Sequence, residues 1–192
     1  KIKENITTVP VLYNTQLMIL PVTDYRYNDD DNIVLVKNRN RSGQIEIFNP
    51  IKNDYKVSTI SDYESGWLYL TDNGDKALYS ENDNKIIFNN TKNDEEKSFN
   101  VNGKSTLGLI NEERDKAAVI SNTDKTHITI FDSVKNSTKE IRLEHLLDKA
   151  YIHFLNNELL LLSGNYTASG ISYYFINIYW ISNLNDQIII AN

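Results

Sequence analysis

The stretch Ile45–Asp54, with the sequence IEIFNPIKND, decides the fold because it returns three more times along the chain. Two copies read KIIFNNTKND at 85–94 and ITIFDSVKNS at 128–137, and a more divergent copy reads NIYWISNLND at 177–186. The aromatic residues that anchor the copies are 40, 43 and 49 residues apart; they are Phe48, Phe88, Phe131 and Trp180. A period of this size is typical of repeat proteins built from one supersecondary unit.

Each copy alternates apolar and polar residues before its aromatic residue, which is the pattern of a β-strand with one buried face. The Asn, Asp and Lys residues that follow favour a turn. Every unit holds four such strand-forming runs, so we expect four-stranded antiparallel meanders. The expected strands in the four units are 17–20, 32–36, 44–48 and 55–58; 67–70, 76–80, 85–89 and 97–101; 107–110, 116–121, 127–131 and 139–143; and 151–155, 158–162, 173–181 and 187–190.

Three segments depart from this pattern. Val22–Asp31 lengthens the first connection of the first unit, and Gly164–Gly170 lengthens the second connection of the fourth. Between the third and fourth units, apolar residues at i, i+3, i+4 and i+7 predict one or two helical turns; they are Leu143, Leu146, Leu147 and Ala150.

The stretch Lys125–Asp132, followed by a hydrophilic turn and Glu140-Ile141, resembles the second half of a WD-type β-propeller blade. It is equally similar to the YVTN and TolB-type blades of bacterial proteins. The resemblance implies an all-β, four-bladed β-propeller-like repeat of antiparallel four-stranded meanders, with a single domain over 1–192 and units at about 10–60, 61–104, 105–148 and 149–192. The alternative is half of a larger propeller completed by a second copy.

The repeat also predicts register and ring closure. Asp75-Lys76-Ala77 recurs as Asp115-Lys116-Ala117 forty residues on, so we expect the strands to keep one register and the four anchoring aromatic residues to occupy equivalent buried positions. A propeller must pair its ends. We therefore expect Ile6–Val9 to pair with a strand of the fourth unit, within one chain or across a dimer.

Composition limits the function classes. The chain has 192 residues, 40% of them hydrophobic and 24% charged, with a net charge of −6. The acidity argues against nucleic acid as a partner, and no apolar run reaches the length of a membrane helix. Cysteine is absent, which excludes disulfides and Cys-ligated zinc. Because the chain begins at Lys1, we expect an excised domain or a processed mature chain.

No catalytic residue, metal site or cofactor is predicted, because the nucleophile, zinc-protease and phosphate-binding motifs are missing. His127 and His153 fall within expected strands, where we predict structural imidazoles, and His145 is expected to be solvated. Asp24 and Asp29–Asp31 lack the spacing of a calcium loop and are expected to be solvated.

Ligand binding is expected on the face where the outer-to-inner connections and the second-to-third connections open. Aromatic and charged residues there would suit a peptide or a sugar; the candidates are Arg39, Arg41, Asp62, Tyr63, Glu64 and Tyr166.

The expected function is a non-enzymatic ligand-sensing or protein-interaction domain. The TolB-type resemblance implies the extracytoplasmic sensory part of a bacterial membrane-anchored regulator, in the periplasm or outside the cell, with a protein, small ligand or glycan as partner. One alternative is a glycan-binding or glycan- or lactone-hydrolysing enzyme, which would need paired carboxylates on the innermost strands, but none of the expected innermost strands contains a carboxylate. The other is an oligomeric assembly module, such as a homodimer.

Overall fold

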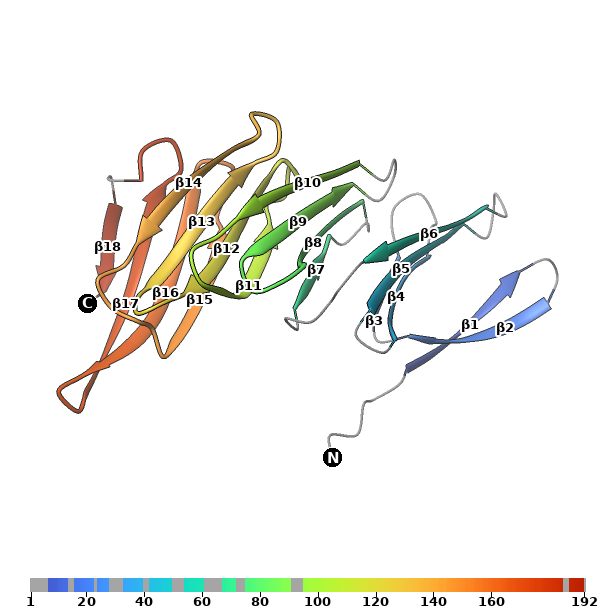
Figure 1. Ribbon diagram of the computed structural model, residues 1–192, viewed down its shortest axis with the longest axis horizontal. Coiled ribbons are helices and arrows are strands. Elements are labelled where there is room, and N and C mark those ends of the chain that lie inside the picture. Colours follow the sequence, from blue (N-terminus) through green and yellow to red (C-terminus); the bar gives the residue numbers. More distant parts are fainter. Residues whose placement is uncertain are drawn as a thin grey trace.

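The structure is a computed structural model (Figure 1). It describes the backbone of residues 7–13, 16–22, 24–27, 33–39, 42–49, 54–60, 67–71, 75–90, 95–184 and 187–191. Side chains are described for most of 67–184 and for Ile188.

The described residues form one hairpin and four antiparallel four-stranded sheets. The hairpin is β1 (Thr7–Tyr13) and β2 (Gln16–Val22). The first sheet is β3 (Asp24–Tyr27), β4 (Ile33–Arg39), β5 (Ser42–Asn49) and β6 (Asp54–Ile60). The second is β7 (Leu68–Leu70), β8 (Lys76–Ser80), β9 (Lys85–Asn90) and β10 (Glu95–Asn100). The third is β11 (Lys104–Ile110), β12 (Lys116–Asn122), β13 (Thr126–Asp132) and β14 (Ser137–Arg142). The fourth is β15 (Lys149–Phe154), β16 (Leu159–Ala168), β17 (Ile171–Trp180) and β18 (Gln187–Ala191).

The predicted all-β repeat of meanders is confirmed. In every four-stranded sheet the strands pair in chain order, and no helix occurs in the described parts of the chain. The sheets follow one another in a row, with β1 at one end and β18 at the other (Figure 1).

The N-terminal strands differ from the prediction. The run 17–20 lies in β2, and the first sheet instead begins with β3, inside the span that was expected to be an insertion. The predicted pairing of Ile6–Val9 with the fourth unit is wrong, because β1 pairs with β2 from Thr7↔Val22 to Tyr13↔Gln16. A hairpin closed by a short loop loses far less chain entropy than a pairing between distant ends of the chain.

The predicted helical turns at 143–150 are also wrong. The segment is an irregular connection whose backbone amides donate to other elements: Leu143 N to the Thr126 carbonyl, Leu147 N to Thr126 Oγ1, and Asp148 N to the Asn165 carbonyl. These bonds replace the i to i−4 bonds of a helix, while Leu147 is buried in the core beside β16. The apolar spacing therefore reflects packing of a connection.

The expected connection Gly164–Gly170 is part of a long hairpin. The strands β16 and β17 pair without interruption to Ala168↔Ile171. Ser169 and Gly170 form the turn, with φ of 52° and 77°. Positive φ at both central residues is the geometry of a type I′ turn, whose twist suits a two-residue hairpin.

The core lies between neighbouring sheets. Between the second and third, the Phe99 and Phe131 rings stack with centroids 4.5 Å apart, and Phe88 meets Phe131 edge-on at 5.9 Å. Between the third and fourth, Ile130 packs with Leu160 and other buried residues. Because middle sheets bury both faces, stacking is what completes each unit.

Phe88 and Phe131 are buried, as predicted, but they are not equivalent. Ala77 and Ala117 are the second residues of the corresponding strands β8 and β12, yet Ala77 pairs with Asn89 whereas Ala117 pairs with Phe131. The two aromatic residues are thus one position apart in the pairing of their strands, and a shift of one residue turns a side chain to the other face of the sheet. Phe88 faces the following sheet, and Phe131 faces the preceding one. The structural counterpart of Phe88 in the third sheet is Ile130.

The fourth unit departs from the prediction in the same way. Trp180 is 39% exposed, so the prediction that it is buried is wrong. Tyr179, which pairs with Leu160, is 4% exposed and faces the third sheet as Phe131 faces the second. The side chain of Phe48 lies outside the described residues.

In the second and third sheets, a lysine on the last strand of the sheet bonds to the sheet that follows. Lys97 pairs with Phe88, and its Nζ donates to the Ser133 carbonyl of the next sheet at 2.7 Å. Lys139 pairs with Ile130, and its Nζ donates to the carbonyls of Ile181 and Ser182 at 2.9 and 2.7 Å. The two lysines therefore occupy equivalent positions in the structure. The sequence repeat does not align them, because Lys97 follows Phe88 by nine residues and Lys139 follows Phe131 by eight.

Candidate functional site

Only one of the predicted ligand-binding residues has a described side chain. Arg39 ends β4, but its side chain lies outside the described residues, as do Arg41 and 62–64. Tyr166 lies inside β16, in a strand and not in the connection that was predicted.

Tyr166 is the middle ring of a three-ring stack at one edge of the fourth sheet. The His145 ring lies 4.1 Å from it, inclined by 16°, and the Tyr173 ring lies 5.2 Å from it, inclined by 15°. Tyr166 and Tyr173 are cross-strand partners in the β16–β17 hairpin, which brings their side chains together on one face. We call these three residues the aromatic face.

The connection that carries His145 is fixed to the hairpin. Asp148 Oδ2 accepts a hydrogen bond from Thr167 Oγ1 at 2.8 Å and from Asn165 Nδ2 at 3.3 Å. These bonds hold the imidazole against Tyr166 without a helix. His145 is exposed, as predicted.

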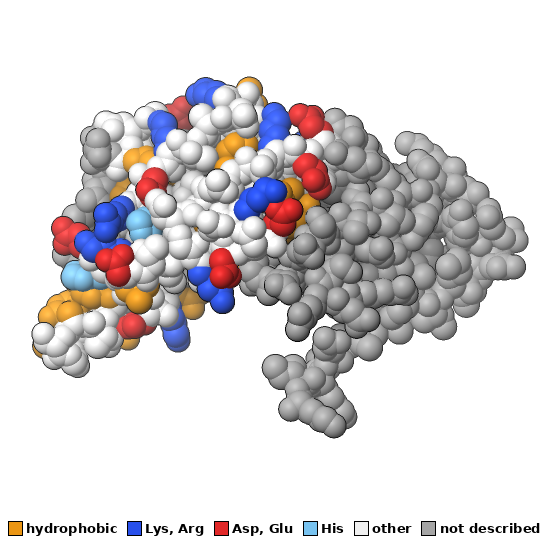
Figure 2. Space-filling model, in the orientation of Figure 1, with side chains coloured by type: hydrophobic (Ala, Val, Ile, Leu, Met, Phe, Trp, Pro, Cys, Tyr) orange, Lys and Arg blue, Asp and Glu red, His pale blue; other side chains and the backbone are white. Residues whose placement is uncertain are grey.

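A cavity of about 240 Å³ adjoins the aromatic face. Leu143, Leu147 and Phe175 give it apolar walls, and Glu144 and Asn177 add a carboxylate and an amide. Apolar side chains protrude on the β16–β17 hairpin that carries this surface (Figure 2). Aromatic and apolar side chains beside a few polar groups are a usual composition of small-ligand sites.

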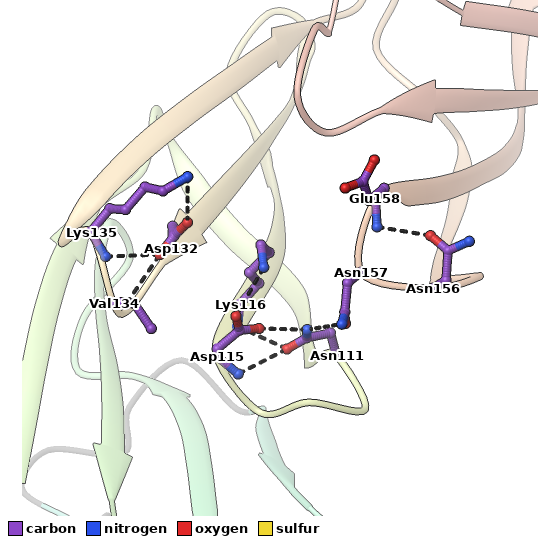
Figure 3. Close-up of polar contacts among 9 residues, drawn as sticks. All are labelled: Asn111, Asp115, Lys116, Asp132, Val134, Lys135, Asn156, Asn157 and Glu158. Atoms are coloured by element: carbon purple, nitrogen blue, oxygen red, sulfur yellow. Dashed lines mark hydrogen bonds and ion pairs between the residues drawn. The ribbon is translucent and has the colours of Figure 1, made fainter.

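A second cavity, of about 370 Å³, lies between the third and fourth sheets at their other edge. Figure 3 shows its polar seam. Asn111 Nδ2 donates to Asp115 Oδ1 at 2.7 Å and to Asn157 Oδ1 of the fourth sheet at 2.8 Å. Asp132 Oδ1 accepts the backbone amides of Val134 and Lys135, which fixes the β13–β14 turn.

The charged residues that line this second cavity are three lysines and three acidic residues, and each lysine is paired or hydrogen-bonded within the fold, Lys116 to Asp115 beside the cavity. Burial opposes ionisation of Asp115, but hydrogen bonds from Lys116 and Asn111 outweigh it and lower the pKa of the carboxyl. Lys139 also lines the cavity and is bonded to the fourth sheet. Acidic and basic side chains intermingle over the visible face (Figure 2). We read this cavity as a structural seam.

The remaining histidines separate into two environments. His127 is buried, with Nδ1 2.8 Å from Glu140 Oε1 and Nε2 3.1 Å from Thr123 Oγ1, which confirms a structural imidazole. His153 lies in β15 but is exposed, so the same prediction for it is wrong. Across the described residues, no group of three or more His, Asp or Glu side chains is placed to hold a metal. No helix there is long and apolar enough to span a membrane.

Comparison with known proteins shows the fold. No protein-family model and no curated protein matches the sequence. The β-propeller domain of the Trilobed protease from Pyrococcus furiosus is similar at 14% identity, with a TM-score of 0.61 over 88% of this chain and 56% of that one. The RRP9 WD40 repeats align at 10% identity and a TM-score of 0.56, over 88% and 50% of the two chains. Apo AztD from Citrobacter koseri aligns at 9% identity and a TM-score of 0.58, over 90% of this chain and 47% of that one.

These likenesses confirm the predicted β-propeller-like fold. The chain spans about half the length of the three proteins it matches. Its stacked meanders therefore align with a part of each of these longer chains.

Proposed function

We propose that this β-propeller chain is a non-enzymatic binding module, and that its aromatic face recognises an extended peptide or a glycan. The observation that carries the proposal is the stack of His145, Tyr166 and Tyr173 beside the 240 Å³ cavity. Rings held in place by the sheet lose little conformational entropy on binding, and aromatic residues dominate the energy of many interfaces.

The size of the cavity indicates the kind of ligand. Pockets that enclose a whole small molecule are about 300–1,000 Å³, so a cavity of about 240 Å³ accommodates one side chain or one sugar ring. The rest of the ligand would lie across the exposed rings. Tyr173 is 41% exposed and offers such a surface.

The proposal includes the other predicted residues. Arg39, Arg41 and the segment 62–64 belong to connections that open at the same edge in a propeller, and they would extend the surface with charges. A role as the extracytoplasmic, ligand-sensing part of a bacterial regulator is also proposed, on the resemblance to TolB-type blades.

A hydrolase is the weaker candidate. Glycoside hydrolysis requires two carboxylates that flank the scissile bond. The first strands of the four sheets, β3, β7, β11 and β15, contain a single carboxylate in their sequences, that of Asp24. A binding role needs no such pair.

Arrays of peptides and of glycans, probed with the labelled chain, test this function. We expect a hit whose affinity falls at least about tenfold in Tyr173→Ala, as for an aromatic hot spot. Tyr174→Ala is the matched control, because Tyr174 is the next residue on the opposite face, and it should leave affinity within about twofold. Hits that bind both variants equally, or the absence of hits, would contradict the proposal.

A further inference from the structure

The cavity beside the aromatic face has an acidic lining. Among the described residues that line it, Glu144 is the only acidic one, and none is a lysine or an arginine. Two larger cavities differ in this respect. The second cavity is lined by lysines as well as acidic residues, and a cavity of about 450 Å³ between β7, β11 and β15 is lined by Arg114 as well as Glu112. The cavity at the aromatic face therefore has a negative charge that its own lining does not neutralise.

The carboxylate of Glu144 is available to a ligand. Its side chain is exposed, and no hydrogen bond or ion pair joins it to another described residue. The basic residues of the neighbouring strands act on a different carboxylate. A hydrogen bond from Thr123 is the main cause that lowers the pKa of Asp124, and the charges of Arg142 and Lys125 lower it further. These two cations therefore lie beside Asp124.

The other two charges of the connection lie on the far side of the hairpin. Asp148 Oδ2 accepts a hydrogen bond from Asn165. Lys149 pairs with Asn165, and cross-strand partners share a face of the sheet. Tyr166, the next residue of the strand, points to the opposite face. Asp148 and Lys149 have opposite charges, so the negative charge of the cavity comes from its own lining.

The ring stack suits a planar cation. His145 ends the stack and is exposed, and Tyr166 covers only one face of its ring. An arginine guanidinium is planar, stacks on aromatic rings and bonds a carboxylate through two parallel N–H groups. Glu144 precedes His145 in the chain, so the carboxylate lies next to the ring on which a guanidinium would stack. A lysine ammonium is a more strongly hydrated point charge and cannot extend a stack.

The walls and the size of the cavity suit the stem of an arginine. Leu143, Leu147 and Phe175 form apolar walls, and arginine buries its methylene groups on such a surface while its charged head stays near water. A cavity of about 240 Å³ holds one such side chain. The backbone of the ligand would then lie across the exposed ring of Tyr173.

We propose that the cavity beside the aromatic face receives the arginine side chain of an extended peptide, with the guanidinium bonded to Glu144 and stacked on His145. This inference rests on the proposed function, because it names the ligand of the same surface. A neutral sugar ring would leave Glu144 without an opposite charge, so the cavity favours a peptide over a glycan. The net charge of −6 also favours encounter with a basic peptide.

Nuclear magnetic resonance titration of the isotope-labelled chain tests the preference. The probes are blocked pentapeptides that differ only in the central residue, which is arginine, citrulline, lysine or leucine between flanking glycine and serine. Citrulline keeps the shape of arginine without its charge. We expect the arginine probe to shift the amide signals of Tyr166 and Tyr173 and to bind at least about tenfold more tightly than the citrulline probe, because an ion pair and a ring contact are both gained.

Two glutamate variants assign the preference to the cavity. Glu144→Gln should weaken the arginine probe about fivefold, as for an exposed ion pair, and leave the citrulline probe within about twofold. Glu158→Gln is the matched control, because Glu158 is an exposed glutamate at the second cavity. It should change neither probe by more than about twofold.

The outcomes separate this inference from the proposed function. An arginine probe that binds no better than the citrulline probe, or a preference that Glu144→Gln leaves intact, would overturn the inference. Glycans that bind in a Tyr173-dependent way, without any shift caused by the arginine probe, would overturn the inference and support the proposed function. Binding of neither peptides nor glycans would overturn both.

Discussion

Substitution of Phe131 tests the packing between the second and third sheets. Its side chain is 1% exposed, stacked on Phe99 and met edge-on by Phe88. Phe131→Ala removes the ring that joins the aromatic residues of the second sheet to the backbone of the third. The surrounding sheets cannot collapse into the space without losing their hydrogen-bonded register.

The magnitude follows from these contacts. A buried Phe→Ala change costs about 3–5 kcal/mol, and each aromatic pair adds about 0.5–1.5 kcal/mol beyond burial. Phe131 makes two such pairs. We therefore expect a loss near the top of the first range, about 4–5 kcal/mol. Phe131→Leu keeps most of the apolar volume and should cost less than half as much.

Urea unfolding, followed by both circular dichroism and tryptophan fluorescence, measures this loss and checks that the two signals coincide. Val134→Ala, at a 77% exposed turn residue, should change stability by less than about 0.5 kcal/mol. A Phe131→Ala loss below about 2 kcal/mol would refute the reasoning, because no buried aromatic cluster could then join these sheets.

Three further substitutions test separate features. A Cβ at Gly108 would lie 2.4 Å from the Trp67 ring and 2.8 Å from Leu78, so Gly108→Ala should destabilise by about 1–3 kcal/mol in urea unfolding; an unchanged midpoint would contradict this close approach. Lys139→Met removes two charge-assisted bonds to the fourth sheet and should cost about 1 kcal/mol at its exposed position, whereas Lys104→Met, at another exposed strand lysine, should cost nothing measurable. Asp115 has a lowered pKa when folded, so its contribution to stability is present at neutral pH and is lost as the pH falls below the ordinary value of 3.8. The stability difference between wild type and Asp115→Asn should therefore shrink in acid, and a difference that grows in acid would contradict the assignment.

The strands of the second and third sheets could be predicted because turn residues mark their ends. Lys76–Ser80 was predicted with the bounds that the structure shows. The faces of these strands could not be predicted. In β9, the four residues Ile86–Asn89 are all buried, since sheets lie on both sides. A strand buried on both faces loses its alternation, so a slip of one residue leaves no trace in the sequence.

The candidate site was predicted in part for a related reason. Tyr166 was expected in a connection because Gly164 and Gly170 bound its segment, but only Gly170 forms a turn. A Cβ at Gly164 would lie 2.5 Å from the Lys149 carbonyl, so this glycine allows close approach of β15. His145 and Tyr173 were missed as partners of Tyr166, because their stack depends on a connection that bends back over the hairpin.

The most direct test of the stacked-sheet arrangement is a nuclear Overhauser measurement between the rings of Phe88 and Phe131, in protein with labelled phenylalanine. The two rings face each other across one interface, with centroids 5.9 Å apart. We expect a strong cross-peak that disappears in Phe131→Leu. If the two residues instead held equivalent positions on successive sheets, they would be separated by a full sheet spacing of about 10 Å. The absence of the cross-peak would contradict the arrangement of sheets described above.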